Sequence, residues 1–122
     1  MGYYTQYSLE VRNIKKNEVE DLDNELNTRG LINYVFYDKY YDEAYKQLEY
    51  SSYEEQKWYD CEKDMIEISK KFPDAIFQLS GEGEEWGDLW RRYFANGIVE
   101  YCDGQIVYET PKSIEWDSLI QI

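Results

Sequence analysis

Apolar and polar residues alternate strictly at the start of the chain. Between residues 3 and 12, one set of alternate positions is mainly apolar or aromatic and the other is mainly polar. The two sets are Tyr3, Thr5, Tyr7, Leu9 and Val11, and Tyr4, Gln6, Ser8, Glu10 and Arg12. This period of two predicts a β-strand with one buried face. The β-rich run 31–37 is expected to form a further strand.

Two stretches carry apolar residues at helical spacing. The first has Asn17 and Glu20 as a capping box and Gly30 where a helix would stop. The second has Asp60 as a candidate cap and Pro73 as a stop. Their apolar stripes are Val19, Leu22 and Leu26 in the first, and Cys61, Met65, Ile68 and Phe72 in the second. Both stretches are therefore predicted to be helices with one buried face.

The second half of the chain returns to β-structure. Asn96-Gly97 and Asp103-Gly104 have the sequence of tight hairpin turns between strands. The predicted strands are 75–80, 89–94, 98–102 and 105–110, and the tail 112–122 is expected to form an edge segment. The segment 38–56 is polar, acidic and rich in tyrosine, and it sustains neither period. We expect it to be an irregular or weakly helical insertion.

These elements predict one α+β domain over residues 1–122. The expected fold is a ferredoxin-like antiparallel sheet with two main helices packed on one face and the Tyr-rich insertion.

The charge narrows the classes of partner. The chain has 26 acidic and 13 basic residues, and its net charge is −13. Binding to bare nucleic acid or to an anionic membrane needs lysine and arginine against phosphate, so neither is expected. A basic protein is the natural complement of this charge. Fourteen tyrosines also suit a surface made for recognition.

The residues available for catalysis are few. The chain has no histidine, which removes the usual general base near neutral pH and the commonest zinc ligand. Cys61 and Cys102 form no CxxC pair, so neither structural zinc nor a disulfide framework is predicted. The N-terminus does not have the pattern of a signal peptide, and no apolar run reaches membrane-spanning length. We expect a cytoplasmic protein that is not an enzyme and that needs no cofactor or metal.

The run Leu79 to Phe94, "LSGEGEEWGDLWRRYF", raises several alternatives. Its order of glutamates does not match a calcium loop, and its acidic glycine turn would repel a phosphate. An exposed carboxylate cluster also lacks the apolar pocket that a glycosidase acid needs. The structural alternative is a wide glycine turn in which Leu89, Trp90 and Tyr93 pack against the sheet. Arg91 and Arg92 would then pair with neighbouring acids.

The recognition alternative treats the same run as an acidic grip on a partner. Carboxylates around an aromatic anchor can compete for a basic, nucleic-acid-binding groove on another protein, because they take the place of phosphates. The predicted contact residues in the run are Glu82, Glu84, Glu85, Trp86 and Asp88. The acidic face of the first helix could extend this surface through Glu18, Asp21 and Glu25.

The stretch Lys57 to Gly97 resembles small acidic proteins of phages and mobile elements. In these, a helix ending in FP leads to a strand, then to GEGEExGDxW and to a strand ending in YFxNG. The same stretch is more loosely similar to the YubB-like ferredoxin domain. The resemblance implies a phage or mobile-element origin and carries over no catalytic residue. Compact acidic proteins of that origin often inhibit host defence, among them anti-CRISPR proteins and other DNA mimics.

The resulting hypothesis is an inhibitor that binds a basic, nucleic-acid-handling protein of host defence in the bacterial cytoplasm, as an anti-CRISPR protein or a partial DNA mimic. Two alternatives stay open. One is a module that binds a small molecule or nucleotide derivative in a pocket of Tyr and Trp rings. The other is a toxin-neutralising immunity protein, which differs only in its partner.

Overall fold

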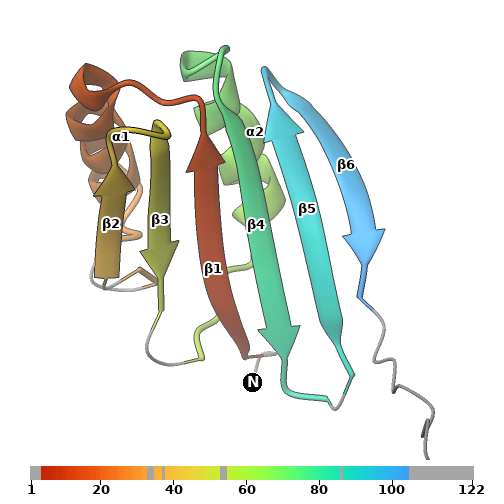
Figure 1. Cartoon of the computed structure of the whole chain (residues 1–122). Helices are drawn as coiled ribbons and strands as arrows, with labels where there is room; N and C mark the ends of the chain where they lie inside the picture. Colours follow the sequence, from red (N-terminus) through yellow and green to blue (C-terminus); the bar gives the residue numbers. More distant parts are fainter. Residues whose placement is uncertain (1–3, 33–34, 37, 53–54, 86, 105–122) are drawn as a thin grey trace, which may run out of the picture.

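The part of the chain that the structure describes forms a six-stranded antiparallel sheet and two helices (Figure 1). The computed structural model describes residues 4–32, 35–36, 38–52, 55–85 and 87–104. The strands stand in the order β2-β3-β1-β4-β5-β6. In chain order the elements are β1 (Thr5–Arg12), α1 (Lys16–Thr28), β2 (Asp38–Asp42), β3 (Gln47–Ser51), α2 (Cys61–Lys71), β4 (Ile76–Gly83), β5 (Leu89–Ala95) and β6 (Ile98–Asp103). The predicted α+β class is therefore confirmed.

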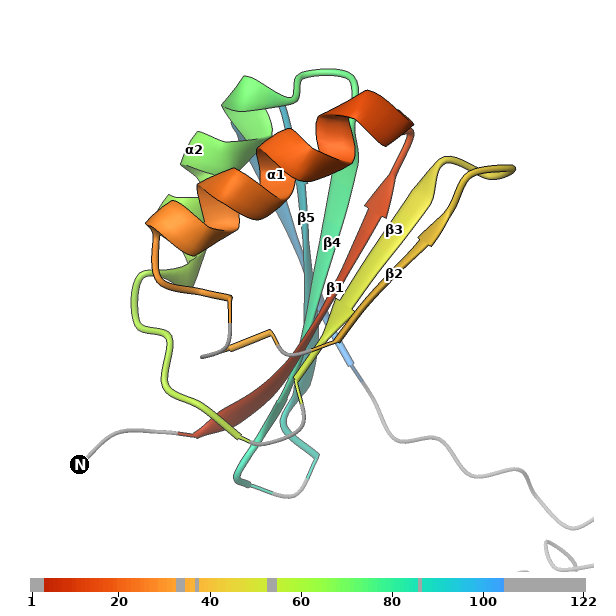
Figure 2. The same cartoon turned by 90° about the vertical axis from the view of Figure 1, so that its left-hand side faces the viewer.

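Both helices lie on the same face of the sheet, as Figure 2 shows. The opposite face is covered by no described helix, and we call it the open face. The alternation predicted for β1 sets this division: Tyr7, Leu9 and Val11 are buried toward the helices. Ser8 and Arg12, between and after them, are exposed on the open face. The buried apolar residues form one core cluster between the sheet and the helices.

Both predicted helices are present, and the predicted stripe of the second is buried throughout. Its members are Cys61, Met65, Ile68 and Phe72. The first helix begins earlier than the sequence suggested, at Lys16, and its cap differs from the predicted one. The backbone N–H of Lys15 donates to the Glu18 carboxylate at 3.1 Å, so the predicted box of Asn17 and Glu20 is wrong by two residues. Gly30 follows the helix with φ of 75°, as expected of a glycine stop.

The prediction that the Tyr-rich segment 38–56 is an irregular or weakly helical insertion is wrong. Its described residues include β2 and β3, which pair as an antiparallel hairpin and extend the sheet beyond β1. Leu48 and Tyr50 are buried at alternate positions of β3, so a short period of two was present. The neighbouring strand β2 did not show the same alternation, because its residues are acids, a lysine and tyrosines. Tyrosine is common on either face of a strand, so it does not mark the buried face.

The strand expected over 31–37 is not found in the described part of that run. Leu31, Val35 and Phe36 are buried there, but the only pairing is an isolated bridge between Ile32 and Phe36. Their apolar character therefore reflects burial in the core rather than membership of the sheet.

The predicted strands over 75–102 are confirmed as β4, β5 and β6. Asn96 and Gly97 have φ of 46° and 83°, as a tight hairpin turn of the predicted kind requires. β4 continues to Gly83, so the first part of the acidic run belongs to the strand rather than to its connection. The strand predicted over 105–110 and the edge segment over 112–122 lie outside the described residues.

Candidate protein-binding surface

The acidic run forms the end of the β4–β5 hairpin. Gly83 donates its backbone N–H to the carbonyl of Asp88 at 2.9 Å, which closes the connection. Within it, the N–H of Asp88 donates to the carbonyl of Glu85 at 3.1 Å, and Gly87 has φ of 82°. Glycine adopts this conformation without the steric cost that other residues bear. The glycines thus shape a wide turn, as the structural alternative expected.

Three of the four carboxylates of the turn are exposed: Glu82, Glu84 and Glu85. Asp88 is half-buried. The N–H of Tyr4 donates to Glu84 at 2.9 Å, so the turn is tied to the start of β1. Trp86, the predicted aromatic anchor, lies outside the described residues. The structure therefore brings the four predicted carboxylates together at one end of the sheet.

Two carboxylates of this end, Glu82 and Glu84, differ in their ion pairing from carboxylates of α1. Among the residues that the structure describes, Glu82 and Glu84 form no ion pair with a lysine or arginine. Carboxylates of α1 do form such pairs: Asp23 binds Lys39, and Glu25 binds Arg29 and Lys71. Unpaired carboxylates at one end of an acidic molecule leave a local negative potential there.

The three predicted residues of α1 do not join the turn. Figures 1 and 2 show α1 on the covered face, away from the end where β4 and β5 meet. Asp21 is exposed, Glu18 is half-buried and accepts the hydrogen bond of the helix start, and Glu25 is 16% exposed. They therefore make a separate acidic region rather than an extension of the turn.

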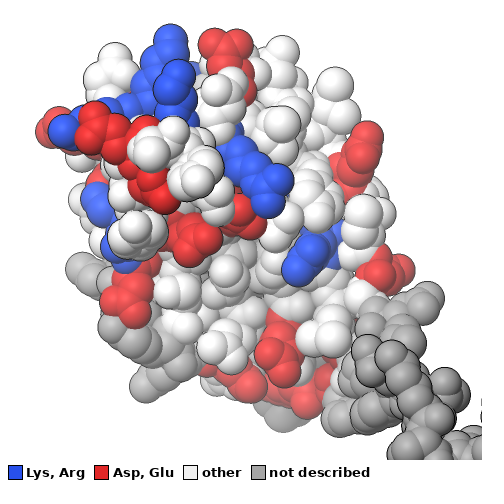
Figure 3. Space-filling view, viewed as in Figure 1, with Lys and Arg blue, Asp and Glu red and all other residues white. Residues whose placement is uncertain are grey.

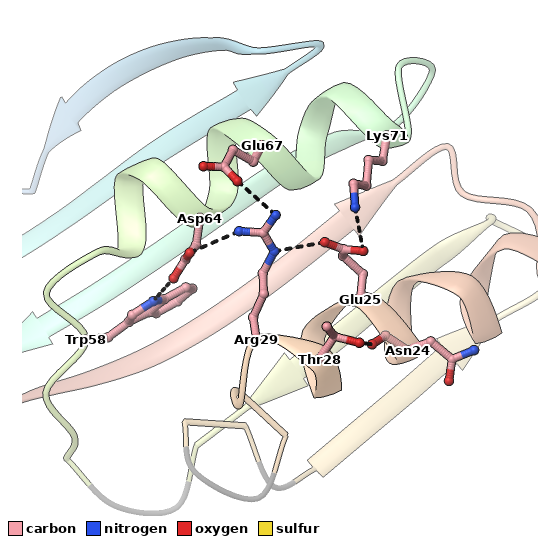
Figure 4. Close-up of polar contacts among 8 residues, drawn as sticks. All are labelled: Asn24, Glu25, Thr28, Arg29, Trp58, Asp64, Glu67 and Lys71. Atoms are coloured by element: carbon pink, nitrogen blue, oxygen red, sulfur yellow. Dashed lines mark hydrogen bonds and ion pairs between the residues drawn. The ribbon is translucent and has the colours of Figure 1, made fainter.

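Glu25 belongs to an ion-pair network between the helices (Figure 4). Its carboxylate accepts from Lys71 at 2.8 Å and from Arg29 at 2.9 Å. The hydrogen bond from Lys71 is the largest cause that holds the pKa of Glu25 below its ordinary value. Arg29 also reaches Asp64 and Glu67 of α2, each at 3.1 Å. This carboxylate is engaged within the fold, which leaves it little capacity for a partner.

Among the described residues, Arg92 forms an ion pair with no neighbouring acid, in contrast to the expectation from sequence. Its guanidinium lies over the Trp90 ring at 4.6 Å and near the Tyr101 ring at 5.5 Å. It also donates to the Cys61 thiol at 3.4 Å. The reason is the strand alternation, which turns Arg92 toward α2 and turns Arg91 to the open face. A planar guanidinium cation interacts favourably with the faces of aromatic rings.

Arg92 stands in a groove between the start of α2 and the outer strands. The groove has a volume of about 470 Å³. Its lining includes Tyr7, Trp58, Trp90, Arg92 and Tyr101. Burial raises the pKa of the Tyr7 hydroxyl and of the Cys61 thiol beside it. This groove could not be predicted from sequence beyond the abundance of aromatic residues, because its parts come from four separate segments of the chain.

Among the described residues, no three Cys, Asp or Glu side chains converge as ligands. In the same part of the chain, no helix is long and apolar enough to cross a membrane. Comparisons with protein-family models, with curated proteins and with solved structures gave no match.

Proposed function

We propose that this protein is an acidic inhibitor that binds a basic protein of host defence at a surface normally used for nucleic acid. The observation that carries the proposal is the β4–β5 turn, where Glu82 and Glu84 are exposed and unpaired with any described lysine or arginine. Carboxylates placed so can take the place of phosphates and speed encounter with a basic partner. The role is binding rather than catalysis, in the bacterial cytoplasm.

A ferredoxin-like core is part of the same proposal. The order β1-α1-β2-β3-α2-β4 along the chain and β2-β3-β1-β4 in the sheet supports it, because the split β-α-β unit has this arrangement. β5 and β6 would then be an addition to that core. This addition creates the β4–β5 turn, so the acidic end would be a feature added to a common scaffold.

The test is capture of partners from a bacterial lysate with three forms of the protein. One is the native chain, and one carries Glu82→Lys and Glu84→Lys at the turn. The matched control carries Glu20→Lys, Asn24→Lys and Asn27→Lys on α1, which changes the net charge by the same amount at exposed positions. Bound proteins are released in rising salt and identified by mass spectrometry.

We expect a basic nucleic-acid-binding protein that the native chain and the α1 variant retain and that the turn variant loses. Duplex DNA should then displace the native chain from that purified partner, because both would occupy one surface. Equal retention by all three forms would end the proposal, because the turn would then contribute nothing to binding. Equal loss by the two variants would also end it, since general charge attraction alone would explain the binding.

A second candidate is a small-molecule binding module, and the groove beside α2 is the observation that favours it. Its volume of about 470 Å³ lies within the range of ligand pockets, roughly 300–1,000 Å³. Aromatic side chains form part of its walls, and the Arg92 guanidinium is one of its charged groups. Thermal unfolding with a panel of nucleotides would test it, because a specific ligand raises the melting temperature.

A further inference from the structure

Three serines form a row across the open face. Ser51, Ser8 and Ser80 are direct partners on the adjacent strands β3, β1 and β4. Two hollows share this row: one of about 340 Å³ over Ser80 and Gly81, and one of about 310 Å³ toward β2. Both include Ser8 and Ser51 in their lining. We call this depression the serine trough.

Longer side chains stand on both sides of the serine trough. The row on one side lies two residues from the serines along each strand and consists of Glu49, Glu10, Gln78, Tyr93 and Glu100. The row on the other side lies two residues from the serines in the opposite direction. It consists of Gln6, Glu82 and Leu89, and the acidic turn follows it. Figure 3 shows this face: acidic side chains gather in its middle and at its lower end, with a mainly uncharged band between them.

The open face as a whole is acidic. Among the strand residues that the structure describes, the alternation places six carboxylates and two guanidinium groups on it. The carboxylates are Asp38, Asp42, Glu10, Glu49, Glu82 and Glu100, and the guanidinium groups are Arg12 and Arg91. A basic occupant is therefore the complementary one.

The spacing of the two flanking rows suits a helix. They are four residues apart along the strands, which corresponds to roughly 13 Å. An α-helix with its side chains is about 10–12 Å across, and the DNA major groove that admits such helices is about 12 Å wide. In DNA, that groove is flanked by phosphates. Here a polar floor of serines is flanked by carboxylates.

We propose that the serine trough binds a basic α-helix of the partner, as a DNA major groove binds a recognition helix. This inference rests on the proposed function and names the element of the partner that is held. The helix would cross β3, β1 and β4, with its lysine or arginine side chains reaching Glu49 on one side and Glu82 on the other. Arg91 follows Ser80 in the same row and limits the trough at β5.

Two synthetic peptides provide the probe. The first is an alanine-based helix of about 17 residues, long enough to be helical alone, with arginine at every fourth position. The second has the same charge but two central prolines, each of which opposes the helix by about 3 kcal/mol. Fluorescence anisotropy measures the affinity of each peptide for the native chain. We expect the helical peptide to bind at least about tenfold more tightly, a difference of about 1.4 kcal/mol.

Two variants test the place of binding. Ser8→Tyr places a bulky side chain in the trough, at an exposed position, and leaves the charge unchanged. Asn24→Tyr, at an exposed position of α1, is its control. Glu49→Gln with Glu82→Gln removes one carboxylate from each side, and Glu20→Lys at an exposed position of α1 is the control with an equal change of net charge. Each trough variant should lose about tenfold in affinity for the helical peptide, and each control about twofold or less.

Equal affinity for the two peptides, or tighter binding of the proline peptide, would overturn the proposal of a helix. Native affinity in both trough variants would also overturn it. If circular dichroism shows that Ser8→Tyr does not fold, the variant with Glu49→Gln and Glu82→Gln tests the place of binding by itself. The proposed function is judged separately: it survives a failed trough if the turn variant still loses its lysate partner.

Discussion

Arg29 and Glu25 form an ion pair at the end of α1, and each of them also binds a residue of α2. The Arg29 Nε atom lies 2.9 Å from the Glu25 carboxylate, one turn earlier on α1, while its terminal nitrogens reach Asp64 and Glu67 of α2. The side chains of Arg29 and Glu25 are only 18% and 16% exposed. Water and salt screen such a pair less than a surface pair. The network therefore fixes the position of one helix against the other.

Replacement of Arg29 by glutamine should lower the free energy of unfolding by about 2–3 kcal/mol, because it leaves three partly buried carboxylates without their shared cation. Urea denaturation followed by circular dichroism measures this change. Arg12→Gln is the control. Arg12 is 64% exposed beside Glu10, and an exposed pair contributes at most about 1 kcal/mol. Equal effects of the two substitutions would show that the network adds no stability.

Glu25 should also make stability depend on pH. Its pKa is lowered in the folded state, chiefly by the hydrogen bond from Lys71, so the unfolded chain binds a proton more readily. This contribution to stability is therefore present above the unfolded pKa of about 4.3 and is lost as the pH falls through the folded pKa. Unfolding free energies of the native chain and of Glu25→Gln, measured from about pH 7 to pH 3, should converge toward acid. A constant difference would contradict this assignment.

Strong periods made the main elements predictable. The stripe of α2 from Cys61 to Phe72 and the alternation of β1 each match a single face that is buried in the structure. Asn96-Gly97 likewise marks its hairpin, since its backbone conformation suits few other residues. The β2–β3 hairpin escaped prediction because only Leu48 and Tyr50 of β3 show its buried face. Two residues are too few to establish a period.

The candidate surface was predictable only where it is local in sequence. Glu82, Glu84, Glu85 and Asp88 meet because they share one turn. Glu25 looked equally suited to a partner, but Lys71 and Arg29 engage it, and the lysine lies 46 residues away. Contacts between distant segments leave no trace in the spacing of one segment. The serine row shows the same limit, since it appears only once the register of three strands is known.

The two cysteines should differ in reactivity. Cys61 is buried and Cys102 is exposed, and burial is the largest cause of the raised pKa of Cys61. The thiolate is the reacting species. Cys61 should therefore react slowly for two reasons: the reagent cannot reach a buried thiol, and the raised pKa keeps the thiol protonated. With Ellman's reagent, one thiol of the native protein should react rapidly. In Cys102→Ser the rapid phase should disappear and return only in denaturant; a rapid phase that persists would place Cys61 at the surface.

Gly81 should tolerate no side chain while Trp90 is present. A Cβ atom at Gly81 would lie 2.2 Å from two atoms of the Trp90 ring, which covers this glycine from the neighbouring strand. Trp90 also packs against Tyr7, with 6.1 Å between the ring centroids. Gly81→Ala must therefore displace the indole, and we expect a loss of about 1–3 kcal/mol in the free energy of unfolding.

A double-mutant cycle separates this contact from any general cost of alanine in β4. In Trp90→Ala the ring is gone, so the further change Gly81→Ala should cost less than about 0.5 kcal/mol or stabilise slightly, because alanine restricts the unfolded chain. The two substitutions should then couple by more than about 1 kcal/mol, as contacting residues do. Additive effects would mean that the indole does not lie over Gly81. Since the Trp90 ring lines the groove of Arg92, that result would also change the shape of that groove.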